Sequence, residues 1–201
     1  MPYNSEKHYR RSIRLKEYDY SQAGAYFVTI CAYNRECLFG DIVDGEMQLN
    51  IYGEIVAACW DEVPSHFKNV ELDVFIVMPY HMHGIVIITD SVEARHALPL
   101  QISQTTRGPK SQSLGAIMGS FKSAVTKRIN KSRATPEIPV WQRNYYEHIT
   151  RNEESLNHIR EYILTNPFSW HLDRDNPLRE GDDEFDRWFE SQFKLKAIRR
   201  I

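Results

Sequence analysis

Residues 81–88 read His-Met-His-Gly-Ile-Val-Ile-Ile, an apolar strand pattern that begins with two histidines one residue apart. Successive side chains of a strand point to opposite faces, so His81 and His83 are predicted to emerge side by side while Met82 turns into the core. Two neutral imidazoles can bind a divalent metal, but they leave its coordination incomplete. Gly84 follows, and a glycine in a strand permits close approach of a ligand to the backbone. The stretch therefore predicts half of a metal site.

Strand patterns recur on both sides of this stretch. They are rich in β-branched and aromatic residues, and two of them flank Asp44-Gly45, a dipeptide typical of a tight hairpin. The predicted strands are residues 25–32, 38–43, 47–49, 70–78 and 141–149.

Helical spacing of apolar residues marks three further segments. The first covers residues 51–63 and is expected to end at Pro64, and residues 114–129 form the second. The third begins at about residue 152 and is expected to end before Pro167. This order of strands and helices predicts an α+β domain, a ferredoxin-like antiparallel sheet with helices packed on one face.

The composition is that of one globular domain of 201 residues, 42% of them hydrophobic, without an apolar run long enough to span a membrane. Three scattered cysteines form no zinc motif and favour a cytoplasmic protein with reduced thiols. We expect a basic N-terminal arm over residues 1–20, a domain over 21–170 with a long loop at 90–112, and a tail over 171–201 that is acidic and then basic.

The charge is distributed unevenly, although the net charge is only −2. Residues 94–136 contain no Asp or Glu, and basic clusters of this kind match phosphate backbones, although solvated helix faces are an equally good interpretation. Trp141 is a candidate for base stacking, with burial as the alternative. The candidate DNA-binding residues are Arg10, Arg11, Arg14, Lys122, Lys127, Arg128 and Trp141.

The last predicted helix has a polar edge, because His158, Tyr162 and Asn166 are spaced four residues apart. A tyrosine hydroxyl is a poor nucleophile at its ordinary pKa, so it needs electrostatic help such as a metal on the scissile phosphate. The carbonyl oxygen of Asn166 is a hard ligand suited to Mg²⁺ or Mn²⁺. The rival nucleophiles Tyr145 and Tyr146 lie in an extended segment without a ligand at helical spacing, and we interpret them as core or base-stacking residues.

Four motifs occur together in a particular order. They are residues 24–29 (Gly-Ala-Tyr-Phe-Val-Thr), 77–84 (Val-Met-Pro-Tyr-His-Met-His-Gly), 140–148 (Val-Trp-Gln-Arg-Asn-Tyr-Tyr-Glu-His) and 161–167 (Glu-Tyr-Ile-Leu-Thr-Asn-Pro). With them the chain resembles the HUH single-tyrosine transposases, and among these the REP-associated tyrosine transposases, from about Arg11 to Pro167.

This resemblance implies that Tyr162 attacks single-stranded DNA and forms a 5′-phosphotyrosine link. It also implies that His81, His83 and Asn166 bind the metal, and that the target contains imperfect palindromes that fold into hairpins. One departure is Tyr80, where the family commonly has Asn; its ring is expected to share the face of Met82.

Two hypotheses from different classes remain. The first is a transposase-type endonuclease and strand transferase, and the second is a protein that binds DNA hairpins without catalysis. The four residues of the predicted centre favour the first, because a binding protein needs none of them. A metal hydrolase that uses activated water is weaker, because no carboxylate ligand is apparent near the histidine pair. No membrane partner is expected, and the protein is predicted to be a monomer or a homodimer.

Overall fold

The computed structural model describes residues 18–90, 109–172, 176 and 187. Most of the predicted arm, loop and tail lies outside these residues, and so do Arg10, Arg11 and Arg14. No helix among the described residues is both long and apolar enough to cross a membrane.

A four-stranded antiparallel sheet forms the centre of the fold. Its strands are β1 (Gly24–Cys31), β4 (Val70–Val77), β5 (His81–Ile88) and β6 (Tyr146–Thr150), in the order β4-β5-β1-β6. This arrangement confirms the predicted α+β class and places the two histidines at the start of a central strand. Central position matters for the site, because β5 has paired neighbours on both sides and is held firmly in place.

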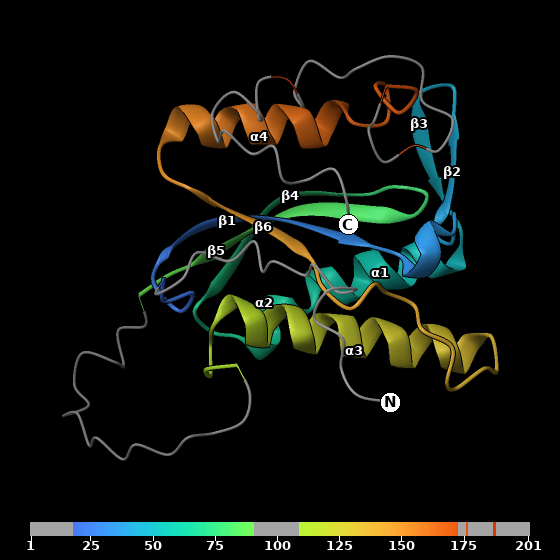
Figure 1. Cartoon of the computed structure of the whole chain (residues 1–201), viewed down its shortest axis with the longest axis horizontal. Coiled ribbons are helices and arrows are strands. Elements are labelled where there is room, and N and C mark those ends of the chain that lie inside the picture. Colours follow the sequence, from blue (N-terminus) through green and yellow to red (C-terminus); the bar gives the residue numbers. More distant parts are fainter. Residues whose placement is uncertain (1–17, 91–108, 173–175, 177–186, 188–201) are drawn as a thin grey trace, which may run out of the picture.

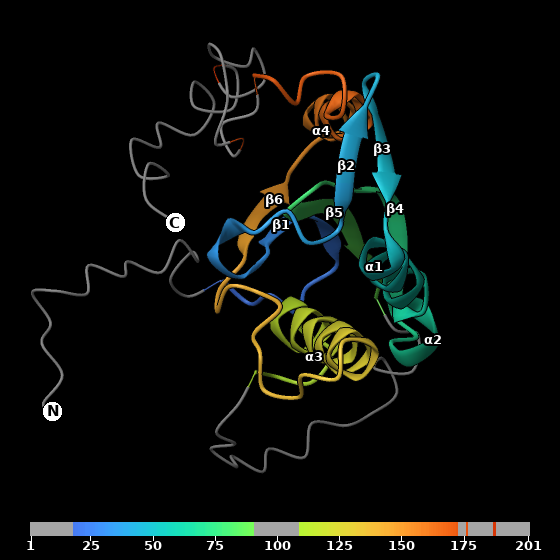
Figure 2. The same cartoon turned by 90° about the vertical axis from the view of Figure 1, so that its right-hand side faces the viewer.

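A separate hairpin consists of β2 (Gly40–Val43) and β3 (Glu46–Leu49), and the short 3-10 helix η1 (Tyr33–Arg35) precedes it. Asp44 and Gly45 have φ values of 53° and 79°, as a two-residue turn with two left-handed positions requires. The predicted hairpin is therefore confirmed. In Figure 2 it stands at the edge of the sheet and reaches toward the level of α4.

Three helices lie on one face of the sheet, below it in Figure 1: α1 (Ile51–Asp61), α2 (Val63–His66) and α3 (Leu114–Ser132). The predicted helix 51–63 is thus divided in two. Pro64 lies in the first turn of α2, where its missing N–H group has no helical partner to lose.

The fourth helix, α4 (Glu153–Thr165), covers the opposite face and lies above the sheet in Figure 1. Its N-cap is Asn152, whose side chain accepts a hydrogen bond from the N–H of Ser155 at 2.8 Å. The expectation of helices on one face therefore holds for α1, α2 and α3 but not for α4. The physical reason is that the strands are apolar on both faces: Phe27 and Ile85 pack against α4, whereas their neighbours pack toward α3.

The predicted strand 141–149 is shorter than expected, because regular pairing begins only at Tyr146. Trp141 forms an isolated bridge with Ala32. Between them, the carbonyl groups of residues 142–144 accept hydrogen bonds from the Lys122 ammonium at 2.6–3.4 Å. These carbonyls are turned toward a side chain of α3, so they do not extend the sheet.

Gly84 serves packing rather than ligand approach. A Cβ atom at this position would lie 2.5 Å from Cζ2 of Trp60, which is fully buried on the face opposite the histidines. The indole therefore occupies the space that any other residue would need. This contact lets β5 pack closely against α1 at the residue that follows His83.

Candidate active site

The two histidines share one face of the sheet, as the alternation along β5 predicted, and this face is the one covered by α4. His81 and His83 are 0% and 1% exposed, and their Nε2 atoms lie 2.9 Å apart. Met82 between them is buried in the cluster on the opposite face. The pair therefore presents two converging imidazole nitrogens to the layer between the sheet and α4.

Thr29 is a site residue that the sequence analysis missed. It lies opposite His83 in the β1–β5 register, and its Oγ1 is 2.8 Å from Nδ1 of the imidazole. A proton on Nδ1 that is donated to Thr29 leaves the lone pair of Nε2 directed at the site. The sequence shows Thr29 as a single hydroxyl in an apolar strand. It does not show that this hydroxyl meets His83, because that contact depends on the register between β1 and β5.

Tyr162 on α4 contacts the histidine pair from above. Its hydroxyl lies 3.2 Å from Nε2 of His83, and the two rings are 5.1 Å apart. Phe27 supports both groups: its ring stacks on His83 at 5.5 Å and meets the Tyr162 ring edge-on at 6.3 Å. The helix and the strand thus bring together three of the predicted site residues, although they are about 80 positions apart in the sequence.

Asn166 is the C-cap of α4 and is 1% exposed. Its backbone keeps helical angles of φ −54° and ψ −40°, so it follows Tyr162 by one turn on the same side of the helix. A residue that precedes proline is disfavoured in α geometry, but Asn166 keeps it although Pro167 follows. The turn is retained because the N–H groups of Phe168 and Ser169 both bond to the carbonyl of Thr165.

Trp170, which follows α4, is a second residue that the sequence analysis did not identify. Its ring lies 5.9 Å from that of His81 and 5.4 Å from that of Tyr80. Tyr80 is fully buried and belongs to the cluster with Met82, so it packs in the core as its expected face implied. The departure from the family motif therefore leaves the histidine pair intact.

The donor set fits a divalent cation with nitrogen and oxygen ligands. The two Nε2 atoms converge to 2.9 Å, and neutral imidazole nitrogens are common ligands of divalent cations. Among the described residues, no group of three or more His, Cys, Asp or Glu side chains could hold a metal. A further protein donor would therefore be an amide oxygen, which is what Asn166 offers.

The remaining tyrosines and histidines of this region have other surroundings. Tyr145 packs against the core on the α3 side, and Tyr146 lies in the cluster below α4 with its ring 6.2 Å from Phe27. His158 is on the exposed part of α4. His148 on β6 is half-buried, and burial together with nearby Arg151 lowers its pKa to about 4.

The predicted DNA-binding residues of α3 are on the opposite side of the sheet from Tyr162. Burial lowers the pKa of Lys122 to about 8, and its ammonium is engaged by backbone carbonyls. Arg128 forms a two-point ion pair with Glu62. Trp141 is 6% exposed and packs against aromatic rings of the core, in agreement with the burial alternative.

Lys127 remains exposed and lines an open groove of about 740 Å³ between α3 and the segment before β6. Lys131 and Arg143 line the same groove and are also exposed, whereas Val140 and Trp141 form part of its apolar wall. The lining residues include four cationic side chains and no acidic one. The groove is therefore positively charged.

Comparisons with known proteins place the chain among relatives. No protein-family model matches it. A protein of Haemophilus influenzae, described as uncharacterized, is 47% identical over 174 residues, which are 86% of this chain and 96% of the relative. The solved structure of a REP-associated tyrosine transposase bound to a REP hairpin superposes with a TM-score of 0.51 at 19% identity, over 79% of this chain and 74% of that one. The fold of the chain is thus the fold of that transposase.

Proposed function

The chain belongs to one family with the Haemophilus influenzae protein and has the fold of a REP-associated tyrosine transposase, and from this premise we propose that it is a transposase. In this proposal it cuts and joins single-stranded DNA as a metal-dependent endonuclease and strand transferase. The observation that carries the proposal is the meeting of the Tyr162 hydroxyl with the His81–His83 pair inside one buried layer.

Tyr162 is the proposed nucleophile. Its hydroxyl oxygen forms a bond to the phosphorus of a phosphodiester, and the bond from phosphorus to the 3′ oxygen of the preceding nucleotide breaks. The phenol loses a proton and the departing 3′ oxygen gains one, so the protons balance. The product is a 5′-phosphotyrosine link and a free 3′-hydroxyl, which can reverse the reaction on another strand and thereby join DNA.

His81, His83 and Asn166 are the proposed ligands of Mg²⁺ or Mn²⁺. When bound, such an ion polarises the phosphoryl group and offsets the charge that develops on it. Thr29 holds the His83 ring in orientation, and Phe27 supports the rings of His83 and Tyr162. These supporting contacts preorganise the site before substrate arrives.

The proposed substrate is single-stranded DNA that contains imperfect palindromes and folds into hairpins. The solved transposase with the same fold is described as bound to a REP hairpin. The groove beside α3 carries positive charge suited to a phosphate backbone. A cytoplasmic location and a monomeric or homodimeric state belong to the same proposal.

The decisive experiment is a denaturing gel with an end-labelled oligonucleotide that carries a hairpin. We expect wild-type protein with Mn²⁺ to form a covalent adduct, and Tyr162→Phe to form none while binding the DNA as before. His81→Ala and His83→Ala should both lose the adduct, and a chelator should abolish it in the wild type.

Tyr145→Phe is the matched control, because it removes a hydroxyl of a rival tyrosine and should leave the adduct intact. An adduct that persists in Tyr162→Phe would refute the nucleophile, and indifference to chelator would refute the metal. Tight hairpin binding without any wild-type adduct would instead support the non-catalytic binding protein.

A further inference from the structure

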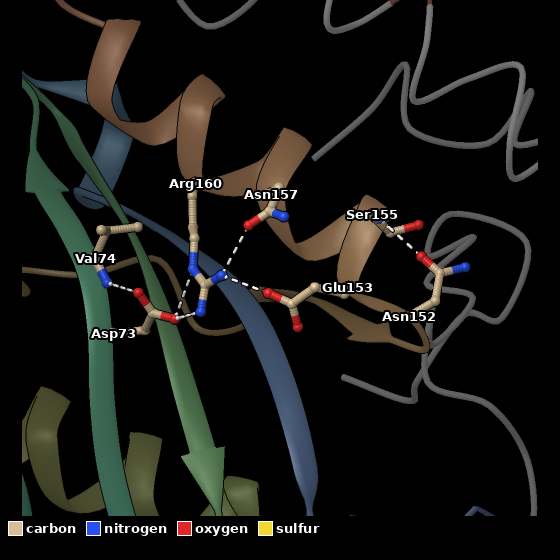
Figure 3. A network of polar contacts seen from close by, with 7 residues as sticks. All are labelled: Asp73, Val74, Asn152, Glu153, Ser155, Asn157 and Arg160. Carbon is tan, nitrogen blue, oxygen red and sulfur yellow. Dashed lines mark hydrogen bonds and ion pairs between the residues drawn. The ribbon is translucent and has the colours of Figure 1, made fainter.

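A polar network joins α4, the helix that carries Tyr162, to the edge strand β4 (Figure 3). The Nε and Nη2 atoms of Arg160 both donate to one carboxylate oxygen of Asp73, at 2.9 and 2.6 Å. Nη1 donates to Glu153 at 2.9 Å and to Asn157 at 2.8 Å, both on α4 itself. The guanidinium is therefore oriented by its own helix and directed at a residue of the sheet.

The carboxylate of Asp73 is oriented by its own strand, β4. Its other carboxylate oxygen accepts a hydrogen bond from the N–H of Val74 at 2.7 Å, and the pairing of β4 with β5 is irregular between Leu72 and Phe75. Burial alone would raise the pKa of Asp73, but the hydrogen bonds from Arg160 and Val74 lower it, so the group is a carboxylate at neutral pH. Its side chain is only 14% exposed, and that of Arg160 is 31% exposed.

The side chains that pack between α4 and the sheet are mainly apolar. Leu156, Ile159 and Ile163 pack on Phe27 and Ile85. Such contacts hold the helix against the sheet, but they are not directional and resist small sliding or rotation only weakly. The Arg160–Asp73 ion pair also joins α4 to the sheet, and its charge-assisted hydrogen bonds are directional, so they oppose sliding of the helix along its axis.

We propose that Asp73 and Arg160 are positioning residues for Tyr162, an inference that rests on the proposed function. Arg160 precedes the tyrosine by two residues, so a shift of the helix at one position is transmitted to the other. The distance at stake is the 3.2 Å between the Tyr162 hydroxyl and Nε2 of His83. A displacement of about 1 Å at a reacting group can cost about a hundredfold in rate.

The test uses the full-length protein and the hairpin oligonucleotide. Asp73→Asn, Arg160→Gln and the double variant are compared in single-turnover adduct formation at saturating DNA and in DNA affinity. Hydrogen exchange of the α4 amides provides a readout that does not depend on activity. Asp19→Asn is the control, because it makes the same acid-to-amide change in an ion pair with Lys110 that does not involve α4.

We expect each single variant to lose at least about tenfold in adduct rate with unchanged DNA affinity. The double variant should lose no more than either single one, because both changes remove the same interaction. Exchange should become faster in residues 153–165 but not in β1 or β5, and Asp19→Asn should behave as the wild type in all three measurements.

Folded variants that keep the wild-type rate, or unchanged exchange in α4, would overturn the positioning role. Equal losses of rate in Asp19→Asn would also overturn it, because they would indicate general destabilisation. A wild type that forms no adduct would count against the proposed function instead, and the exchange measurement would then still decide whether the pair fixes α4.

Discussion

Replacing Thr29 by Val tests whether the orientation of His83 matters for the chemistry. The two side chains have nearly the same shape, so no cavity forms and the change removes mainly one hydroxyl. That hydroxyl is 2.8 Å from Nδ1 of His83, and both residues are buried, at 3% and 1% exposure. The imidazole therefore loses a partner at a place that water does not reach.

The magnitude follows from that burial. A buried hydrogen-bonding group that loses its partner costs about 1–3 kcal/mol of stability. The loss of a hydrogen bond that orients a metal-binding histidine typically costs about 10–100-fold in metal affinity or activity. We therefore expect Thr29→Val to be folded but less stable, and to need more Mn²⁺ for a given adduct rate.

Urea unfolding followed by tryptophan fluorescence measures the first effect, and adduct formation across a Mn²⁺ titration measures the second. Thr29→Ser keeps the hydroxyl and serves as the control, which should retain most of the metal response. The reasoning is refuted if Thr29→Val and wild type show the same dependence on Mn²⁺, or if Thr29→Ser is as impaired as Thr29→Val.

Two further outcomes concern pH and salt. The pKa of His148 is about 4 in the folded protein and near 6.5 in the unfolded chain. The unfolded chain therefore binds this proton more readily, and the free energy of unfolding falls as the pH drops from 6.5 toward 4. The loss amounts to about 3 kcal/mol, and His148→Gln should flatten the wild-type dependence of unfolding free energy in this window; an unchanged slope would contradict the burial argument. For DNA binding, Lys127→Gln combined with Lys131→Gln should reduce the slope of log affinity against log salt by about 1.4, since each single-strand phosphate contact contributes about 0.7. A slope equal to that of the wild type would remove this side of the groove from the interface.

The sequence predicted those features that depend on local periodicity and turn chemistry. Alternation along β5 placed His81 and His83 together and Met82 on the far side. Helical spacing placed Asn166 one turn after Tyr162. Asp44-Gly45 located the hairpin, because two residues with positive φ are needed there. In each case the determining interactions lie within a few residues of one another.

The features that could not be predicted depend on contacts between distant segments. Thr29 meets His83 only through strand register, and Arg160 meets Asp73 across 87 positions of the chain. β6 starts late because Lys122, a side chain of α3, binds the carbonyl groups that would otherwise extend the strand, and no local pattern in residues 141–149 indicates this contact. The role of Gly84 could not be predicted for the same reason, because it depends on contact with the indole of Trp60, a distant residue.

The short connection between β6 and α4 has a consequence for how the reactive centre is assembled. Strand β6 ends at Thr150 and α4 begins at Glu153, so only Arg151 and Asn152 lie between them. At no more than about 3.6 Å per residue, this link keeps the start of the helix within roughly 11 Å of its own sheet. The helix that carries Tyr162 is therefore tied at its start to the sheet that carries the histidines, and in this structure one polypeptide supplies both.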